Sequence, residues 1–143
     1  MEWKIEVRRR PGAYDAHGHE VLGQVHDLGV TSVKAVESAR LFYLDTAAPR
    51  DQVERVARDL LTDPVVERYL LSDGTPGEAD ARPSVTVRRK PGVMDPVAMS
   101  ALQAAADMGI SVHRCATARK YYFAGKPTPH HLETIARSVL ANP

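Results

Sequence analysis

The stretch RRRPGAYD at residues 8–15 decides the fold, because it returns as RRKPGVMD at residues 88–95. The offset between the copies is 80 residues as far as Gly29 and Gly109. With one residue deleted after these glycines, the offset becomes 79 and the match continues to the end of both copies. It closes on Asp63-Pro64 in the first copy and on Asn142-Pro143 in the second. A period of this length is too long for a solenoid repeat, so the sequence predicts a tandem of two small domains.

The predicted organisation has two units and a linker. Unit 1 covers residues 1–71, the linker residues 72–82 and unit 2 residues 83–143. The linker is rich in Gly, Pro, Asp and Glu, a composition typical of connecting segments. A unit of about 70 residues can build only a marginal core by itself. We therefore expect the two units to pair.

Composition excludes several classes of protein. The chain has 143 residues, of which 43% are hydrophobic and 26% charged, with a formal net charge of +1. This profile is that of an ordinary globular protein, and no overall field would recruit nucleic acid or an anionic membrane. No segment is apolar for long enough to cross a bilayer, and no secretory signal is visible. With Cys115 as the single cysteine, a reducing, cytoplasmic location is expected.

Local patterns predict the same order of elements in both units. Alternation of apolar and charged residues over 3–8 and 85–88 is typical of a half-buried strand. A Pro-Gly turn follows, and Asp15 or Asp95 then stands where a helix N-cap is expected. Helical spacing of apolar residues follows; they are Val21, Leu22, Val25 and Leu28 in unit 1, and Met99, Leu102, Ala105 or Ala106 and Met108 in unit 2.

The rest of each unit predicts two strands and a second helix. Residues 33–44 and 112–123 are too long for one straight strand, so we interpret each as two strands joined at Ser38-Ala39 or Thr117-Ala118. Residues 65–71 have the composition of a closing strand that unit 2 lacks. The predicted fold class is α+β: two ferredoxin-like units, each a small antiparallel sheet with two helices on one face, forming a pseudo-dimer.

Taken together, these motifs resemble the PurS family, the small subunit of phosphoribosylformylglycinamidine synthase. Residues 84–143 carry the resemblance best, through RRKPGVMDP and a final helix that ends in LANP, and residues 3–71 carry it more weakly. The family's usual Gly-Lys between the middle strands is replaced by Ala39-Arg40 and Ala118-Arg119. The family's subunit is also usually one unit that dimerises, whereas a tandem resembles the N-terminal region of some fused PurL-type synthases.

The resemblance implies a role in assembly. The chain is expected to be a non-catalytic scaffold of formylglycinamide ribonucleotide amidotransferase in de novo purine biosynthesis, bridging a PurL-type synthase and a PurQ-type glutaminase. Catalytic residues are expected in those partners, and so are ATP and Mg²⁺, with no cofactor in this chain. We also expect either that the chain continues past Pro143 or that a partner donates the absent strand, since the sheet would otherwise keep an open edge.

The candidate partner-interface positions are those of the repeated motifs. They are Arg8, Arg10, Pro11, Gly12, Asp15, Arg40, Arg88, Lys90, Pro91, Gly92, Asp95 and Arg119. The basic runs at 8–10 and 88–90 have three interpretations: solvated charges beside a turn, which is the simplest, a contact with an acidic partner surface, and a phosphate contact.

Other reactive residue types have plainer interpretations. His17, His19, His26, His130 and His131 lie on helices without the acidic or cysteine partners of a zinc site, so we expect them to face solvent. Cys115 aligns with a valine of unit 1, which favours a small core residue over a nucleophile.

Two further functions are alternatives to the scaffold. The aromatic pairs at 42–43 and 121–123 could stack RNA bases, but neighbours in a strand alternate faces and the Gly-rich RNA-binding signature is absent. Outward-facing aromatics are expected instead to anchor the pairing of one sheet with the other. The main alternative function is an ACT-like regulatory tandem that binds a small amino acid between the units.

Overall fold

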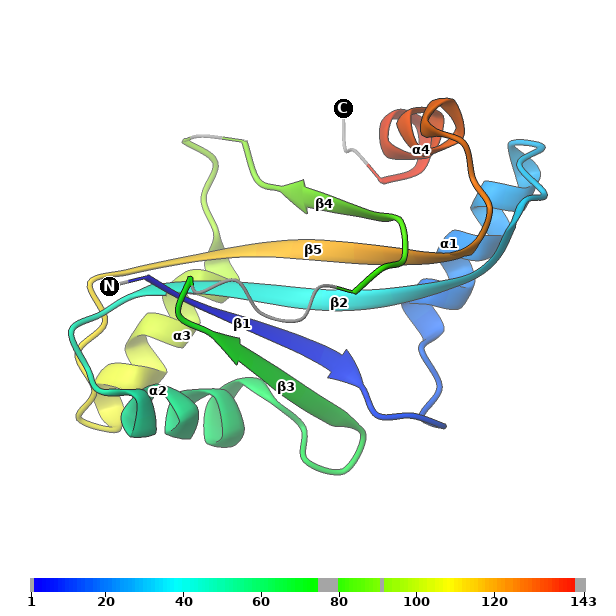
Figure 1. Cartoon of the computed structure of the whole chain (residues 1–143). Coiled ribbons are helices and arrows are strands. Elements are labelled where there is room, and N and C mark those ends of the chain that lie inside the picture. Colours follow the sequence, from blue (N-terminus) through cyan, green and yellow to red (C-terminus); the bar gives the residue numbers. More distant parts are fainter. Residues whose placement is uncertain (1, 75–79, 91, 141–143) are drawn as a thin grey trace.

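The computed structural model describes residues 2–74, 80–90 and 92–140, and Figure 1 shows its α+β architecture. In chain order the elements are β1 (Glu2–Arg9), α1 (Ala16–Asp27), β2 (Val33–Asp45), α2 (Arg50–Val56), the π-helical turn η1 (Ala57–Leu61), β3 (Glu67–Ser72), β4 (Ser84–Arg88), α3 (Pro96–Asp107), β5 (Arg114–Gly125), α4 (Pro129–Ile135) and the π-helical turn η2 (Ala136–Leu140).

One antiparallel sheet runs through both units, in the order β3-β1-β2-β5-β4. The units join edge to edge where β2 pairs with β5, so backbone hydrogen bonds hold them together. The units therefore do not pair sheet against sheet through outward-facing aromatics, as expected; the outward-facing Tyr122 instead adds hydrogen bonds to Glu6 and Arg8 of unit 1. The antiparallel α+β fold with helices on the sheet is confirmed.

The two long segments at the centre are single strands, so their interpretation as two strands each is wrong. β2 has 13 residues and β5 has 12, and they pair along almost their whole length. At about 3.3 Å per residue such a strand reaches roughly 40 Å. Two different helices cover its two halves, and this length lets one strand serve two cores.

Each of the two hydrophobic cores takes residues from both units. The first core combines Ile5, Phe42 and Val56 of unit 1 with Ala101 and Ala105 of α3. The second core combines valines of α1 and of the start of β2 with aromatics of β5 and with α4; its buried members are Val21, Val25, Val30, Val33, Val36, Tyr121, Phe123 and Ile135. Accordingly, α2 lies beside α3 at one end of the sheet and α1 beside α4 at the other (Figure 1).

The helix α3 of unit 2 packs in the first core, and α1 of unit 1 packs in the second. This exchange of helices between the units has a large energetic consequence. A fully buried valine side chain contributes about 1.5 kcal/mol or more. Unit 1 places five such valines in the second core. Their summed contribution is comparable to the whole stability of a typical domain, about 5–15 kcal/mol. Neither core would be complete without the other unit.

Both first helices begin as predicted. Asp15 accepts a hydrogen bond from the Gly18 N–H at 2.9 Å, and Asp95 accepts one from the Ala98 N–H at 3.0 Å. The predicted buried stripe of α3 is confirmed at Ala105, which is buried, and Met108 packs against the first core, but it is wrong at Met99, which is 57% exposed. The helix also buries Ala98 and Ala101, whose small side chains suit a closely packed helix.

The described end of the predicted linker, at Asp80 and Arg82, lies on the sheet face opposite the helices. Asp80 and Arg82 contact side chains of β1, β2 and β5, while residues 75–79 lie outside the described part of the chain. The boundaries 1–71, 72–82 and 83–143 remain a prediction.

Candidate functional site

A basic groove lies near the centre of the sheet. Its volume is about 680 Å³. The cationic residues along it are Arg40, Arg88, Arg89, Lys90 and Arg119, and apolar lining comes from Phe42, Val87, Val93, Val97, Tyr121 and Leu140. Four positions singled out in the sequence, Arg40, Arg88, Lys90 and Arg119, therefore meet at one site. A smaller hollow beside it is lined by Asp95 and Cys115.

Two arginines face each other in the middle of this groove. Arg40 of β2 and Arg119 of β5 occupy equivalent repeat positions and are direct cross-strand partners. The internal pseudo-twofold axis therefore passes between them. Like charges placed directly opposite in a sheet destabilise it, so this pair requires compensation.

Only one of the two arginines is compensated within the described residues. Arg40 donates to both carboxylate oxygens of Glu67 on β3, each at 2.9 Å, and to the Leu61 carbonyl at 3.0 Å. No described carboxylate lies within ion-pairing distance of Arg119, which is exposed. The groove thus keeps an unbalanced positive charge beside Arg119.

Two hydrogen-bonded side chains, Tyr121 and His17, lie beside Arg119. Tyr121 Oη lies 2.8 Å from His17 Nε2. Burial, followed by the positive charge of Arg119, lowers the pKa of His17, so its ring is neutral at pH 7. Burial raises the pKa of Tyr121. Both side chains therefore act as neutral hydrogen-bonding groups beside the cation.

The two motif aspartates are structural anchors. Besides capping α1, Asp15 accepts hydrogen bonds from the backbone and hydroxyl of Ser38 on β2, both at 2.7 Å. Asp95 binds Thr117 of β5 in the same way, at 3.0 and 2.6 Å. Burial opposes ionisation of Asp95, but the hydrogen bonds from Thr117 and Ala98 outweigh it and hold the pKa of this carboxyl below its ordinary value. Each aspartate ties a helix start to a central strand.

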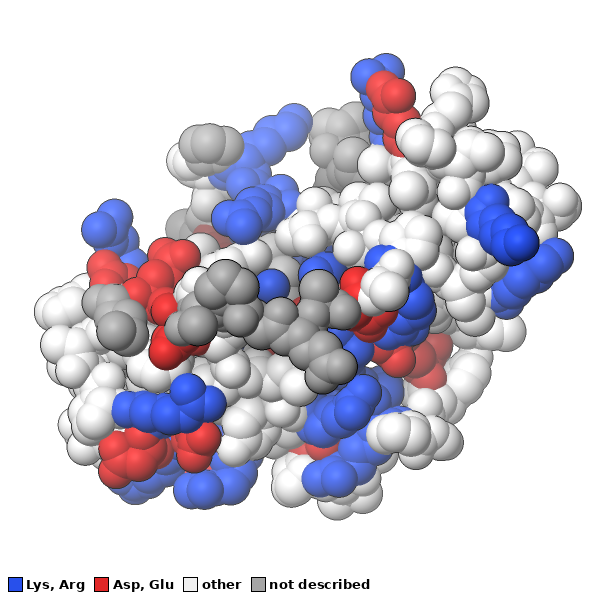
Figure 2. Space-filling view, in the orientation of Figure 1, with Lys and Arg blue, Asp and Glu red and all other residues white. Residues whose placement is uncertain are grey.

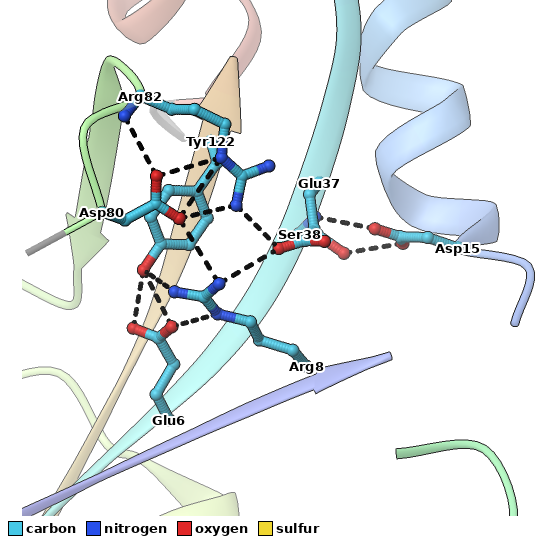
Figure 3. A network of polar contacts seen from close by, with 8 residues as sticks. All are labelled: Glu6, Arg8, Asp15, Glu37, Ser38, Asp80, Arg82 and Tyr122. Carbon is cyan, nitrogen blue, oxygen red and sulfur yellow. Dashed lines mark hydrogen bonds and ion pairs between the residues drawn. The ribbon is translucent and has the colours of Figure 1, made fainter. Parts of the chain in front are cut away.

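Arg8 is the exception to the interpretation of the basic runs as solvated, whereas Arg10 and residues 88–90 are exposed. Arg8 is 9% exposed and lies on the sheet face opposite the helices, within the network of Figure 3. Its guanidinium bonds the Glu6 carboxylate and donates to Tyr122 Oη at 2.7 Å. The Tyr122 hydroxyl in turn donates to Glu6 at 2.8 Å. Arg8 is therefore part of the folded structure and not a free charge.

The linker completes this network. Asp80 lies 3.4 Å from Arg8, and Arg82 donates to Glu37 at 3.1 Å. Hydrogen bonds from Arg82 hold the pKa of Asp80 well below its usual range. Figure 2 shows the acidic and basic side chains interleaved on this face. Because Glu6 and Tyr122 lie on strands of different units, the network ties the units together.

The remaining motif residues shape turns. Gly12 and Gly92 have φ angles of +84° and +81°, a conformation that favours glycine, in the turns that follow β1 and β4. The Nε–H group of Arg10 donates a hydrogen bond to the Pro64 carbonyl at 3.1 Å. Pro11 lies in the first of these turns. Pro91 lies outside the described residues.

The histidines and Cys115 show no catalytic arrangement in the described parts of the chain. His17 and His131 are half-buried and hydrogen-bonded, so the expectation that they face solvent is wrong; His19, His26 and His130 are exposed. The described residues contain no group of three or more His, Cys, Asp or Glu side chains that could hold a metal ion. Cys115 packs at the edge of the first core, and burial raises the pKa of its thiol to about 11.

Sequence reasoning missed the partners of the arginines. Glu6 alternates with apolar residues and therefore looked solvent-facing, and Glu67 looked like one charge in an ordinary strand. The signal in the sequence was that Glu67 lies in residues 65–71, just after the stretch that repeats. On a separate point, the helices in the described part of the chain are too short or too polar to span a membrane.

Comparison with known proteins identified one family. Residues 2–72 match the model of PurS, described as phosphoribosylformylglycinamidine (FGAM) synthase. Among solved structures, PurS of Methanocaldococcus jannaschii, a subunit of formylglycinamide ribonucleotide amidotransferase, is similar at 19% identity and a TM-score of 0.46, over 50% of this chain and 92% of its own. PurS of B. subtilis is similar at 21% identity and a TM-score of 0.45, over 50% and 94%. Comparison with curated protein sequences gave no match.

Proposed function

Residues 2–72 place this chain in the PurS family, and on that premise we propose that it is a non-catalytic scaffold that joins the ATP-dependent synthase and the glutaminase of its complex. Family membership gives the chain a role in FGAM synthase, in purine biosynthesis. The bridging role and the identity of the partners, a PurL-type synthase and a PurQ-type glutaminase, are the proposed parts. ATP and Mg²⁺ would bind in the synthase partner.

The observation that carries the proposal is the exchange of helices between the two cores. A scaffold needs a rigid body with partner-binding surfaces, and the shared sheet and cores make the tandem one body from the start. Two separate units would have to find each other, whereas a covalent tandem pairs intramolecularly. The basic groove beside Arg119 offers such a surface to an acidic partner segment.

The test reconstitutes synthase and glutaminase with and without the full chain. The chain should raise glutamine-dependent formation of formylglycinamidine ribonucleotide and leave the ammonia-dependent reaction of the synthase unchanged, since it contributes assembly and not chemistry. Arg119→Glu should weaken this stimulation. Arg55→Glu, an exposed change on α2 outside the groove, is the matched control.

Two outcomes would overturn the scaffold. One is an unchanged glutamine-dependent rate together with no co-purification of either partner. The other is thermal stabilisation of the chain by a free amino acid in the absence of partners, which the ACT-like alternative requires.

A further inference from the structure

The outer edge of β4 has no pairing strand among the described residues, although the equivalent edge of β1 does. β4 in unit 2 corresponds to β1 in unit 1, and β1 is covered on this side by β3. An open strand edge presents backbone N–H and C=O groups that can pair with another chain. Within the described residues, the edge of β1 is therefore the filled copy of this site and the edge of β4 is the unfilled copy.

The backbone of β4 is oriented to accept a strand. Phe123 N–H donates to the Pro83 carbonyl at 2.9 Å, so by alternation Val85 and Val87 turn their backbone groups toward β5. Thr86 and Arg88 then turn theirs toward the open edge. On β1 the same alternation begins where Arg10 N–H donates to the Val66 carbonyl at 2.8 Å, ahead of β3.

The second core is less covered beside the edge of β4, which has no pairing strand in the described ranges. Ile5 and Val7 of β1 are 0% and 2% exposed, with β3 beside them. Their counterparts Val85 and Val87 are only half-buried. Leu61 at the end of η1 is 8% exposed, whereas its counterpart Leu140 at the end of η2 is half-buried. These side chains together present apolar surface beside the open edge.

The charge of the site specifies what the strand should carry. In the filled copy, Glu67 lies opposite Arg9 and reaches the central Arg40. In the unfilled copy, Arg89 takes the place of Arg9, and Arg119 takes that of Arg40 without a described carboxylate. A glutamate opposite Arg89 would reach Arg119 in the same geometry.

We propose that β4 and the groove beside it bind an extended strand of a partner polypeptide, antiparallel to β4, with a glutamate opposite Arg89 and apolar residues at the second and fourth positions after it. Main-chain bonds would supply affinity, and alternate side chains specificity, as in other strand additions. The inference rests on the proposed function only in assigning the strand to a partner.

The chain carries its own probe for this site. A labelled synthetic peptide of residues 63–72, which contains β3, should bind the full chain as measured by fluorescence anisotropy. Replacing Glu67 of the peptide by glutamine should weaken binding about tenfold, the loss expected for one charge-assisted hydrogen bond. Arg119→Gln in the full chain should weaken it similarly, and Arg55→Gln should have no effect.

N-methylation of the peptide tests the pairing without altering the protein. Arg68 and Leu70 pair with β1 through their backbone N–H groups, and Tyr69 turns its own N–H away. N-methyl-Leu70 peptide should lose binding, and N-methyl-Tyr69 peptide should retain it.

The proposal is overturned by no binding, by equal binding of both methylated peptides, or by binding that Arg119→Gln leaves unchanged. It is also overturned if the chain self-associates in ultracentrifugation and the peptide does not compete. Because the assay contains neither synthase nor glutaminase, its failure and that of the scaffold function are separate results.

Discussion

Replacing Arg8 by methionine should destabilise the fold far more than the same change at Arg88, its counterpart in the repeat. Arg8 is buried against Glu6, which is 5% exposed, and against Tyr122. Arg88 is exposed and makes one hydrogen bond, to Tyr43 Oη at 3.1 Å. The two changes are chemically identical, so their difference isolates the network.

The magnitude follows from the charge left behind. Removing one partner of a buried ion pair typically costs about 3–5 kcal/mol, because the other charge stays buried. The Tyr122 hydroxyl would still donate to Glu6, which favours the lower end, about 3 kcal/mol. An exposed substitution such as Arg88→Met should cost about 0.5 kcal/mol. Adding Glu6→Gln to Arg8→Met should recover part of the loss, since it removes the stranded charge.

Urea unfolding followed by the fluorescence of Trp3, which is buried in the first core, measures these free energies. The midpoint should fall at constant m-value if stability alone changes. Arg8→Met and Arg88→Met differing by less than about 0.5 kcal/mol, the usual scatter of surface substitutions, would refute the assignment of Arg8 to a buried network.

Three further predictions follow from the hydrogen bonds and burial described above. Asp95→Ala should lower the free energy of unfolding by about 1–2 kcal/mol at pH 7. The pKa of Asp95 is lower in the folded chain than in the unfolded chain, where it is about 3.9. The stabilisation by the Asp95 carboxylate is therefore present above about pH 3.9 and is lost as the pH falls through the folded pKa. Urea titrations at neutral and acidic pH should show the cost shrinking in acid, and equal costs would contradict the prediction. Cys115, with a pKa of about 11, should react with iodoacetamide at pH 8 about a hundredfold more slowly in the folded than in the unfolded chain, as thiolate fractions require; equal rates would show that the thiol is not protected. Glu67→Gln should lower the free energy of unfolding by about 1 kcal/mol, because it leaves the charge of Arg40 without its carboxylate partner opposite Arg119. Urea titrations should show a smaller loss in 1 M salt, where screening acts over about 3 Å. A loss that does not change with salt would exclude charge repulsion as the cause.

The sequence by itself determined the repeat, the element types and several helix starts. The Asp15 and Asp95 caps could be recognised because capping is decided by residues close in the chain. Period-two alternation located β1 and β4 for the same reason. The candidate site was found in part, since Arg40, Arg88, Lys90 and Arg119 do line one groove.

Only the tertiary structure decided how the units combine and which arginines are paired. The exchange of helices between the cores cannot be seen in local periodicity. The valines of α1 have the same helical spacing in the sequence whichever half of the sheet the helix covers. Arg8 and Arg88 look equivalent in the repeat, yet Tyr122 and the linker bury only the first. Burial and charge pairing depend on residues that lie far apart in the chain, so they are settled only when the strands come together.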